Sequence, residues 1–212
     1  MKTLHDSWQR MWSGLGAKGD GTNLCASLMG RYAEPHRKYH TLQHLQACIT
    51  WFEKTAHLAL HSAEVEAALW FHDAIYDLER HDNEAQSAEW ARVELTAVGV
   101  NESAILRVAQ LVLATKHTVL PGLPDEKLVV DIDLAILGAP QHQFAEYERQ
   151  IREEYAFVPE VIFLQKRCEI LQSFLAREFI YTTELLHTLL EARARHNLFD
   201  AVQAIHCIVM KS

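Results

Sequence analysis

The chain has 212 residues, of which 49% are hydrophobic and 23% charged, so it can bury a sizeable core and has no disorder-like composition. Its formal net charge of -8 argues against a nucleic-acid partner, because binding a phosphate backbone requires a basic surface. A small phosphate ester stays compatible with this charge, since one metal ion or local cation can reverse the field at a site.

The cysteines are widely spaced and form no C-x-x-C pair, so neither a zinc knuckle nor a redox motif is expected: Cys25, Cys48, Cys168 and Cys207. The first ten residues are polar and lack the apolar stretch of a signal peptide. No apolar run approaches the roughly 20 residues that span a bilayer. We therefore expect a cytoplasmic protein with reduced, buried or half-buried thiols and no membrane partner.

The spacing of apolar residues is helical along most of the chain. Glycines crowd the segment 14–21, which predicts a loop, and the composition of 78–82 predicts a polar break. Ser62 and Asn101 are predicted N-caps, and Gly99 a left-handed C-terminal cap. The helices predicted in this part cover 4–12, 23–33, 41–57, a segment starting at 62, 83–99 and 101–117.

The segment 127–137 suits a strand as well as a helix. We interpret it as a helix, because helices flank it and no second strand is visible to pair with it. The remainder, 141–210, predicts three or four helices, with Thr183 as a candidate cap. With no repeat or linker in view, the prediction is an all-α bundle forming a single domain over 1–212.

Two histidines four residues apart, His40 and His44, lie on one face of a helix or at its start. Imidazole is the commonest protein ligand for divalent metals and the usual acid or base near neutral pH. The chain has 13 histidines, so a chance pair at this spacing stays an open alternative.

An adjacent pair, His72-Asp73, follows an apolar helical run. A carboxylate buried there requires a cation or strong hydrogen bonds, because burying it unpaired costs several kcal/mol. The alternative is that both residues lie past the helix end in solvent. Asp131 and Asp133 interrupt a second apolar run. They point about 200° apart on a helix, so only one is expected to face the core and the other to be solvated.

Taken in order, these motifs resemble the HD superfamily of metal-dependent phosphohydrolases, whose order is His, His-Asp and a distant Asp. The spacing fits, with 28 residues from the first histidine to the second and 60 from the first Asp to the last. The resemblance covers about 31–137, and 141–212 would complete the bundle. It implies a metal held by four residues: His44, His72, Asp73 and Asp133.

Three further comparisons refine this interpretation. The family's Asp-Ala-Asp-x-x-Leu segment selects Asp133 over Asp131 as the ligand. The segments 71–77 and 82–88 are similar to those of a small bacterial group described as predicted HD-type phosphohydrolases. The Tyr-His-x-x-x-His segment resembles class I cyclic-nucleotide phosphodiesterases, which implies His40 as general acid. This chain is far shorter and lacks their purine-binding glutamine region, so a cyclic nucleotide is not implied.

Two imidazoles and two carboxylates suit an octahedral divalent ion such as Mn²⁺, Mg²⁺, Fe²⁺, Co²⁺ or Ni²⁺. About two positions would remain for water and a phosphoryl oxygen, and the ion would activate that water for in-line attack. HD enzymes with two metals recruit further histidines before the last Asp. Only His81 and His117 lie in that interval here, so we expect one ion per chain.

Other polar residues are candidates for catalysis or substrate binding. On a continuing helix Asp77 would face the same side as Asp73 and orient the attacking water, the alternative being a solvated carboxylate. Glu84 would contact metal-bound water or substrate, although a position in the first turn of a helix explains it equally. Candidates for holding phosphate oxygens, unless simply solvated, are Arg37, Lys38, Lys116 and His117.

The predicted function is hydrolysis of a small phosphate ester or anhydride, for example a nucleotide, by attack of metal-activated water. One alternative is a non-catalytic HD module that binds a nucleotide or a protein. A less favoured alternative is a di-iron HD oxygenase, which would need more histidines. The apolar rows in 157–179 are expected to serve as core or as the surface of a homodimer.

Overall fold

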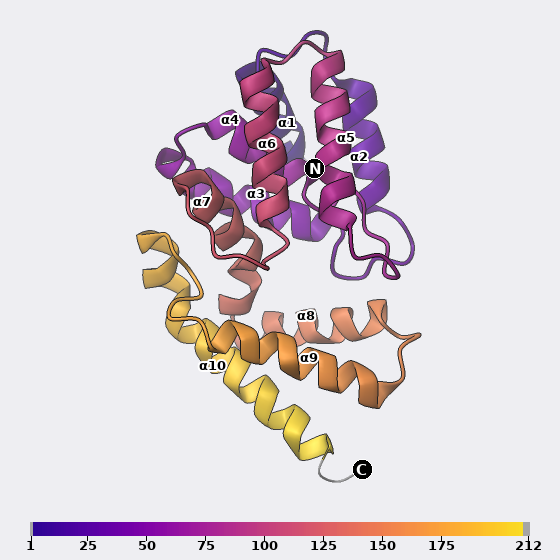
Figure 1. Cartoon of the computed structure of the whole chain (residues 1–212), viewed down its shortest axis with the longest axis vertical. Coiled ribbons are helices and arrows are strands. Elements are labelled where there is room, and N and C mark those ends of the chain that lie inside the picture. The colour runs from indigo at the N-terminus through magenta and orange to yellow at the C-terminus, as the bar shows by residue number, and fades with distance from the viewer. Residues whose placement is uncertain (1, 210–212) are drawn as a thin grey trace. The chain divides into compact units, whose positions relative to one another are not determined.

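The computed structural model describes residues 2–209, and its regular structure there consists of ten α-helices and two short 3₁₀ helices (Figure 1). The predicted all-α class is confirmed for these residues, which include no strand. The predicted end of the last helix, Met210, lies outside them. Among the described helices, none is both long and apolar enough to cross a membrane.

The chain divides into two compact units, Met1–Asp133 and Leu134–Ser212. The segment that carries the motifs, predicted at about 31–137, falls almost entirely in the first unit. A single domain over 1–212 stays a prediction, and the two units are described separately.

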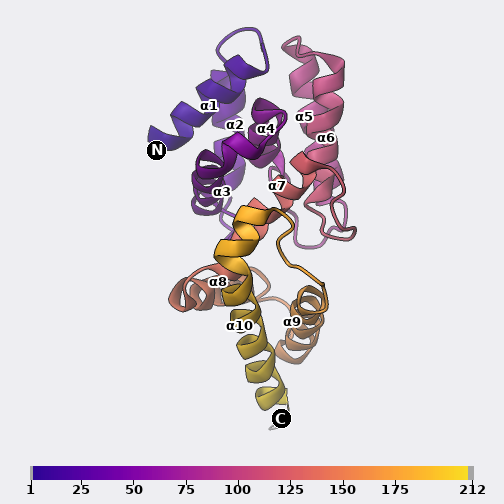
Figure 2. The same ribbon diagram turned by 90° about the vertical axis from the view of Figure 1, so that its left-hand side faces the viewer.

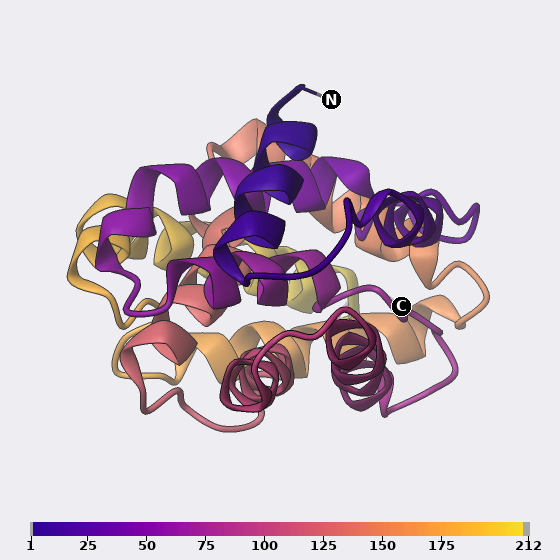
Figure 3. The ribbon, with the colours of Figure 1, turned by 90° about the horizontal axis from the view of Figure 1, so that it is seen from above.

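The first unit is built around one helix, α4, in which every residue from Glu64 to Phe71 is buried. It packs against α1, α3, α5, α6 and α7. Two of these neighbours, α5 and α6, stand side by side, as the view along their axes shows (Figure 3). The helices of this unit are α1 (Lys2–Gly14), α2 (Thr22–Tyr32), α3 (Leu42–Thr55), the 3₁₀ helix η1 (Ala56–Leu58), α4 (Ser62–Phe71), α5 (Asn83–Ala97), α6 (Glu102–Ala114) and α7 (Pro124–Asp133).

The second unit is organised along its longest helix, α10, which packs against α9 and the 3₁₀ helix η2 (Figure 2). Its elements are η2 (Leu134–Gly138), α8 (Gln141–Glu154), α9 (Glu160–Leu175) and α10 (Glu184–Val209). The side chain of Asn197 donates hydrogen bonds to the carbonyls of Leu137 and Ala139 and so ties α10 to η2. Several apolar side chains of 157–179 are exposed: Phe157, Val161, Ile162, Ile170 and Phe179.

The predicted helix ends are confirmed in part. Asn101 accepts a hydrogen bond from the Ser103 amide, and Gly99 has the left-handed φ of 75°. Ser62 is not a cap, because it is already the first helical residue of α4. The carboxylate of Asp125 instead accepts from two amides that precede the helix, at 2.7 and 3.1 Å. The ambiguous segment 127–137 is helical, as predicted, and is shared between α7 and η2.

Candidate metal centre

The start of α3 positions the first motif. The N-cap residue Thr41 accepts a hydrogen bond from the Gln43 amide at 3.3 Å, which fixes where the helix begins. His44 therefore lies in the first turn of α3 and is buried. His40 precedes the helix, so the two histidines lie at a helix start rather than on one helix face.

The end of α4 positions the second motif. The helix stops at Phe71 and His72 is its C-cap residue, so the pair lies at the inner end of a buried helix, as predicted. The Nδ1 atom of His72 lies 2.9 Å from the Leu69 carbonyl oxygen. Because a carbonyl only accepts, Nδ1 carries the proton, and in the neutral ring Nε2 keeps its lone pair for a ligand.

The last residue of α7 completes the set. Asp133 ends the helix, and its side chain is 14% exposed. Asp131, two residues earlier, has no exposed surface at all. The expectation that one of these two carboxylates would be solvated is wrong, because α7 is covered by α3, α4 and α6.

Four potential ligand atoms from these helix ends lie close together. The Nε2 atoms of His44 and His72 are 3.0 Å apart. Asp73 Oδ2 lies 3.4 Å from the first of these nitrogens and 3.0 Å from the second. The corresponding distances of Asp133 Oδ1 are 3.2 and 3.5 Å. Adjacent ligands of an octahedral ion bound at about 2.1 Å are themselves about 3 Å apart, so these atoms suit one shared ion.

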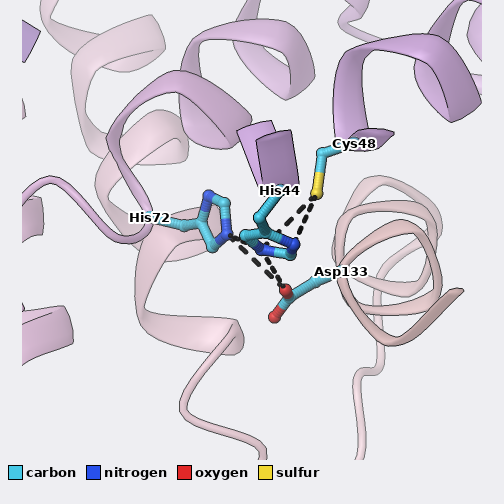
Figure 4. Close-up of side chains that lie close together, drawn as sticks. All are labelled: His44, Cys48, His72 and Asp133. Carbon is cyan, nitrogen blue, oxygen red and sulfur yellow. Dashed lines mark hydrogen bonds and ion pairs between the residues drawn. The ribbon is translucent and has the colours of Figure 1, made fainter. Parts of the chain in front are cut away.

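A cysteine that the sequence analysis did not select also lies here. His44, Cys48, His72 and Asp133 form a cluster whose potential ligand atoms all lie within 4.8 Å of one another and could hold a metal ion (Figure 4). The sulfur is 3.7 Å from Nε2 and 3.8 Å from Nδ1 of the His44 ring. These near-equal distances indicate a thiol packed beside the ring. The signal for it was the spacing of four residues from His44 on a helix.

Burial and charge act in opposite directions on the cluster. Burial lowers the pKa of His44 and His72, but the acidic groups around them, including Asp73 and Asp133, outweigh it and raise both pKa values well above normal. Burial likewise raises the pKa of each carboxyl, yet the neighbouring imidazoles hold both pKa values well below normal. Without a metal, the cluster therefore favours protonated imidazoles.

Aromatic rings line the edge of the cluster next to His40. Its half-buried imidazole stacks on the Tyr76 ring with centroids 4.1 Å apart. The Tyr39 ring lies edge-on to His40 at 5.0 Å and also contacts His44 at 4.8 Å. Electrostatic interaction with His40, after that with His72, contributes to the low pKa of Asp73. His40 thus lies beside the potential ligands with part of its surface in solvent.

The two acidic candidates, Asp77 and Glu84, differ in setting. The expectation that Asp77 continues the α4 helix is wrong, because that helix ends at Phe71. Asp77 is exposed in a loop, where its carboxylate accepts from the Glu79 amide and its carbonyl from Asn83. Glu84 lies in the first turn of α5 and is half-buried.

The four candidates for phosphate binding occupy different environments. Lys38 and Lys116 are exposed, and each donates to a backbone carbonyl, of Pro35 and of His81. His117 lies beside the cluster, with Nε2 2.9 Å from Asp133 Oδ2. The Arg37 side chain is completely buried and bonded to carbonyl groups of the protein. Their contact with a substrate stays a prediction.

Comparisons with protein-family models, with curated proteins and with solved structures find no match to this chain. Among the described residues, a cluster of two histidines, one cysteine and one carboxylate could hold a metal ion.

Proposed function

We propose that this protein is a metal-dependent phosphohydrolase of the HD type that acts on a small phosphate ester or anhydride, for example a nucleotide. The observation that carries the proposal is the convergence of two carboxylate oxygens on two imidazole nitrogens. The nitrogens lie 3.0 Å apart, and each oxygen is 3.0 to 3.5 Å from both of them. This donor set comes from His44, His72, Asp73 and Asp133, the residues that the motif order selects.

The charges of the donor set favour a divalent cation. Two neutral imidazoles and two carboxylates together carry two negative charges, which an ion such as Mn²⁺ or Mg²⁺ would balance. Bound there, the ion would polarise a phosphoryl oxygen and lower the pKa of water. The proton on His72 Nδ1, held by the Leu69 carbonyl, keeps Nε2 available as a donor.

His40 is the residue best placed to supply a proton to a leaving oxygen. It lies beside the cluster without belonging to it, and part of its ring is open to solvent. Stacking on Tyr76 limits the rotation of the ring, and its own carbonyl accepts a hydrogen bond from Arg37. A general acid in this position would contribute about 100- to 10,000-fold to the rate.

The proposal is tested by assaying the purified protein with Mn²⁺ on a panel of nucleotides and other small phosphate esters. We expect release of phosphate by the wild type and its loss in Asp133→Ala. The matched control is Asp131→Asn, which replaces a buried carboxyl group on the same helix two residues earlier. It should lower stability but keep metal-dependent turnover.

Other outcomes would contradict the proposal. A metal-loaded wild type that turns over no ester on the panel would favour a module that binds a nucleotide or a protein without catalysis. Consumption of O₂ by the iron-loaded protein, without phosphate release, would favour the oxygenase alternative.

A further inference from the structure

We infer that Arg37 is a positioning residue that locks together the backbones of the two segments carrying His40, His44, His72 and Asp73. The inference rests on the proposed metal site. It assigns to the arginine a role inside the protein in place of a direct contact with substrate.

The guanidinium joins two segments that are far apart in sequence. Its Nη1 donates to the Asp73 carbonyl at 2.6 Å and to the His40 carbonyl at 3.2 Å. Its Nη2 donates to the Ala74 carbonyl at 3.2 Å. Its Nε donates to the Glu34 carboxylate at 3.1 Å. One planar group thus holds the residues just before α3 and the turn just after α4.

The environment of this side chain is enclosed. Its exposed fraction is 0%, and the guanidinium carbon lies 5.3 Å from the ring centres of both Tyr32 and Tyr76. Arginine is suited to such a place because its charge is delocalised and weakly hydrated and stacks on aromatic faces. A group with no exposed surface does not reach a phosphate in solvent.

The positions of the contacted carbonyls link Arg37 to the proposed metal site. The last carbonyls of a helix lack partners within the helix, and a cation near that end is favourable. The carbonyls of Asp73 and Ala74 belong to the turn that follows α4, where the ligand oxygen of Asp73 originates. If this turn shifts, Asp73 Oδ2 moves away from the His44 and His72 nitrogens.

The hydrogen bonds that Arg37 makes require an arginine side chain. Its five N–H donors form a rigid fork, and the four hydrogen bonds in fixed directions match that shape. Lysine keeps the positive charge but concentrates its three donors on one nitrogen. Arg37→Lys therefore removes the geometry and retains the charge.

The test compares Arg37→Lys with Arg167→Lys, measuring Mn²⁺ affinity by titration and the melting temperature of the metal-free protein. Arg167 is a matched control in the second unit, because its buried guanidinium also pairs with a carboxylate, Glu148, and lies over an aromatic ring, Tyr147. We expect Arg37→Lys to weaken Mn²⁺ binding by about 10- to 100-fold, as loss of a group that orients ligands does. Arg167→Lys should lower the melting temperature and leave Mn²⁺ affinity unchanged.

If Arg37→Lys does not fold, Glu34→Gln provides a milder variant, because Glu34 is partly exposed and holds only the Nε end of the fork. We expect it to weaken Mn²⁺ binding at least about twofold. Unchanged Mn²⁺ affinity in the folded variants, with a raised KM for a phosphate ester, would overturn the inference and make Arg37 a substrate ligand. A wild type that binds no Mn²⁺ would instead contradict the proposed function itself.

Discussion

The Nε2 atom of His117 lies 2.9 Å from Oδ2 of Asp133, while the other oxygen of that carboxylate faces the two histidines of the cluster. The backbone of His117 has a φ of 57°, in the left-handed region that costs a non-glycine residue about 1 kcal/mol or more. Such a conformation persists only where the surrounding structure enforces it. The relationship indicates that His117 orients the carboxylate, so that Oδ1 faces the His44 and His72 nitrogens.

Replacing this histidine should weaken metal binding without unfolding the protein. Asparagine adopts the left-handed conformation readily, so His117→Asn avoids added backbone strain, but its shorter side chain does not reach Oδ2 in the same way. We expect Mn²⁺ affinity to fall by about 10-fold or more and the melting temperature to change little. Titration of both proteins with Mn²⁺ checks this, and unchanged affinity would show that Asp133 needs no such partner.

Asp73 and Cys48 are the two candidates for the fourth ligand of the proposed metal ion, and substitution of each distinguishes them. The carboxylate oxygen lies 3.0 Å from His72 Nε2, whereas the thiol packs beside the His44 ring. We expect Asp73→Ala to abolish stoichiometric metal binding, and Cys48→Ala to retain it at a modest cost in stability. Metal analysis of the two variants after gel filtration tests this expectation. Loss of metal in Cys48→Ala and its retention in Asp73→Ala would make the sulfur the ligand.

The stabilisation that a metal provides should increase with pH. Without metal, the raised pKa values of His44 and His72 stabilise the fold below about pH 6.5, and this contribution is lost as the pH rises through the folded-state values. The lowered pKa values of Asp73 and Asp133 stabilise it above about pH 3.9, and that contribution is lost as the pH falls. A metal must displace the imidazole protons, so low pH opposes its binding.

Melting curves with and without Mn²⁺, recorded from about pH 6 to about pH 8, measure this effect. We predict that the increase in melting temperature caused by Mn²⁺ grows steadily over this range, and that Asp133→Ala shows none. An increase that is larger at the acidic end would have the wrong sign for displacement of protons.

Substitution of alanine for each of two glycines should change stability in opposite directions. A Cβ at Gly138 would lie 2.7 Å from the Leu190 Cβ and 2.9 Å from its carbonyl oxygen, so Gly138→Ala should force α10 away from η2 and cost about 1 to 3 kcal/mol. A Cβ at Gly30, inside α2, would meet no atom within 4 Å. Gly30→Ala should stabilise the protein by about 0.5 to 1 kcal/mol. Urea denaturation of both variants tests the pair, and a similar free-energy change in each would refute the packing argument.

The sequence predicted much of the fold because the apolar spacing is strongly helical, and Asn101 and Gly99 sit where their cap chemistry places them. It failed at Ser62, since the amides before α4 are satisfied by Asp125, a residue distant in sequence. The prediction of a solvated carboxylate was wrong for Asp131, because the sequence does not show that α3, α4 and α6 all pack around α7.

The candidate site, like the fold, could be predicted from the sequence only in part. The motif order selected four residues that the fold brings together, because each lies at the end or start of a helix where local signals are strong. Patterns of spacing gave no indication that Arg37 points inward to carbonyls from two segments, since an arginine beside a motif is usually solvated. The contact between His117 and Asp133 likewise depends on how the loop between α6 and α7 returns to the cluster.

The most direct test of the metal site is anomalous X-ray diffraction from crystals of the protein grown with Mn²⁺. We predict one peak per chain, about 2.0 to 2.3 Å from Nε2 of His44 and of His72 and from one carboxylate oxygen each of Asp73 and Asp133. The absence of a peak among these four atoms at saturating Mn²⁺ would contradict the account.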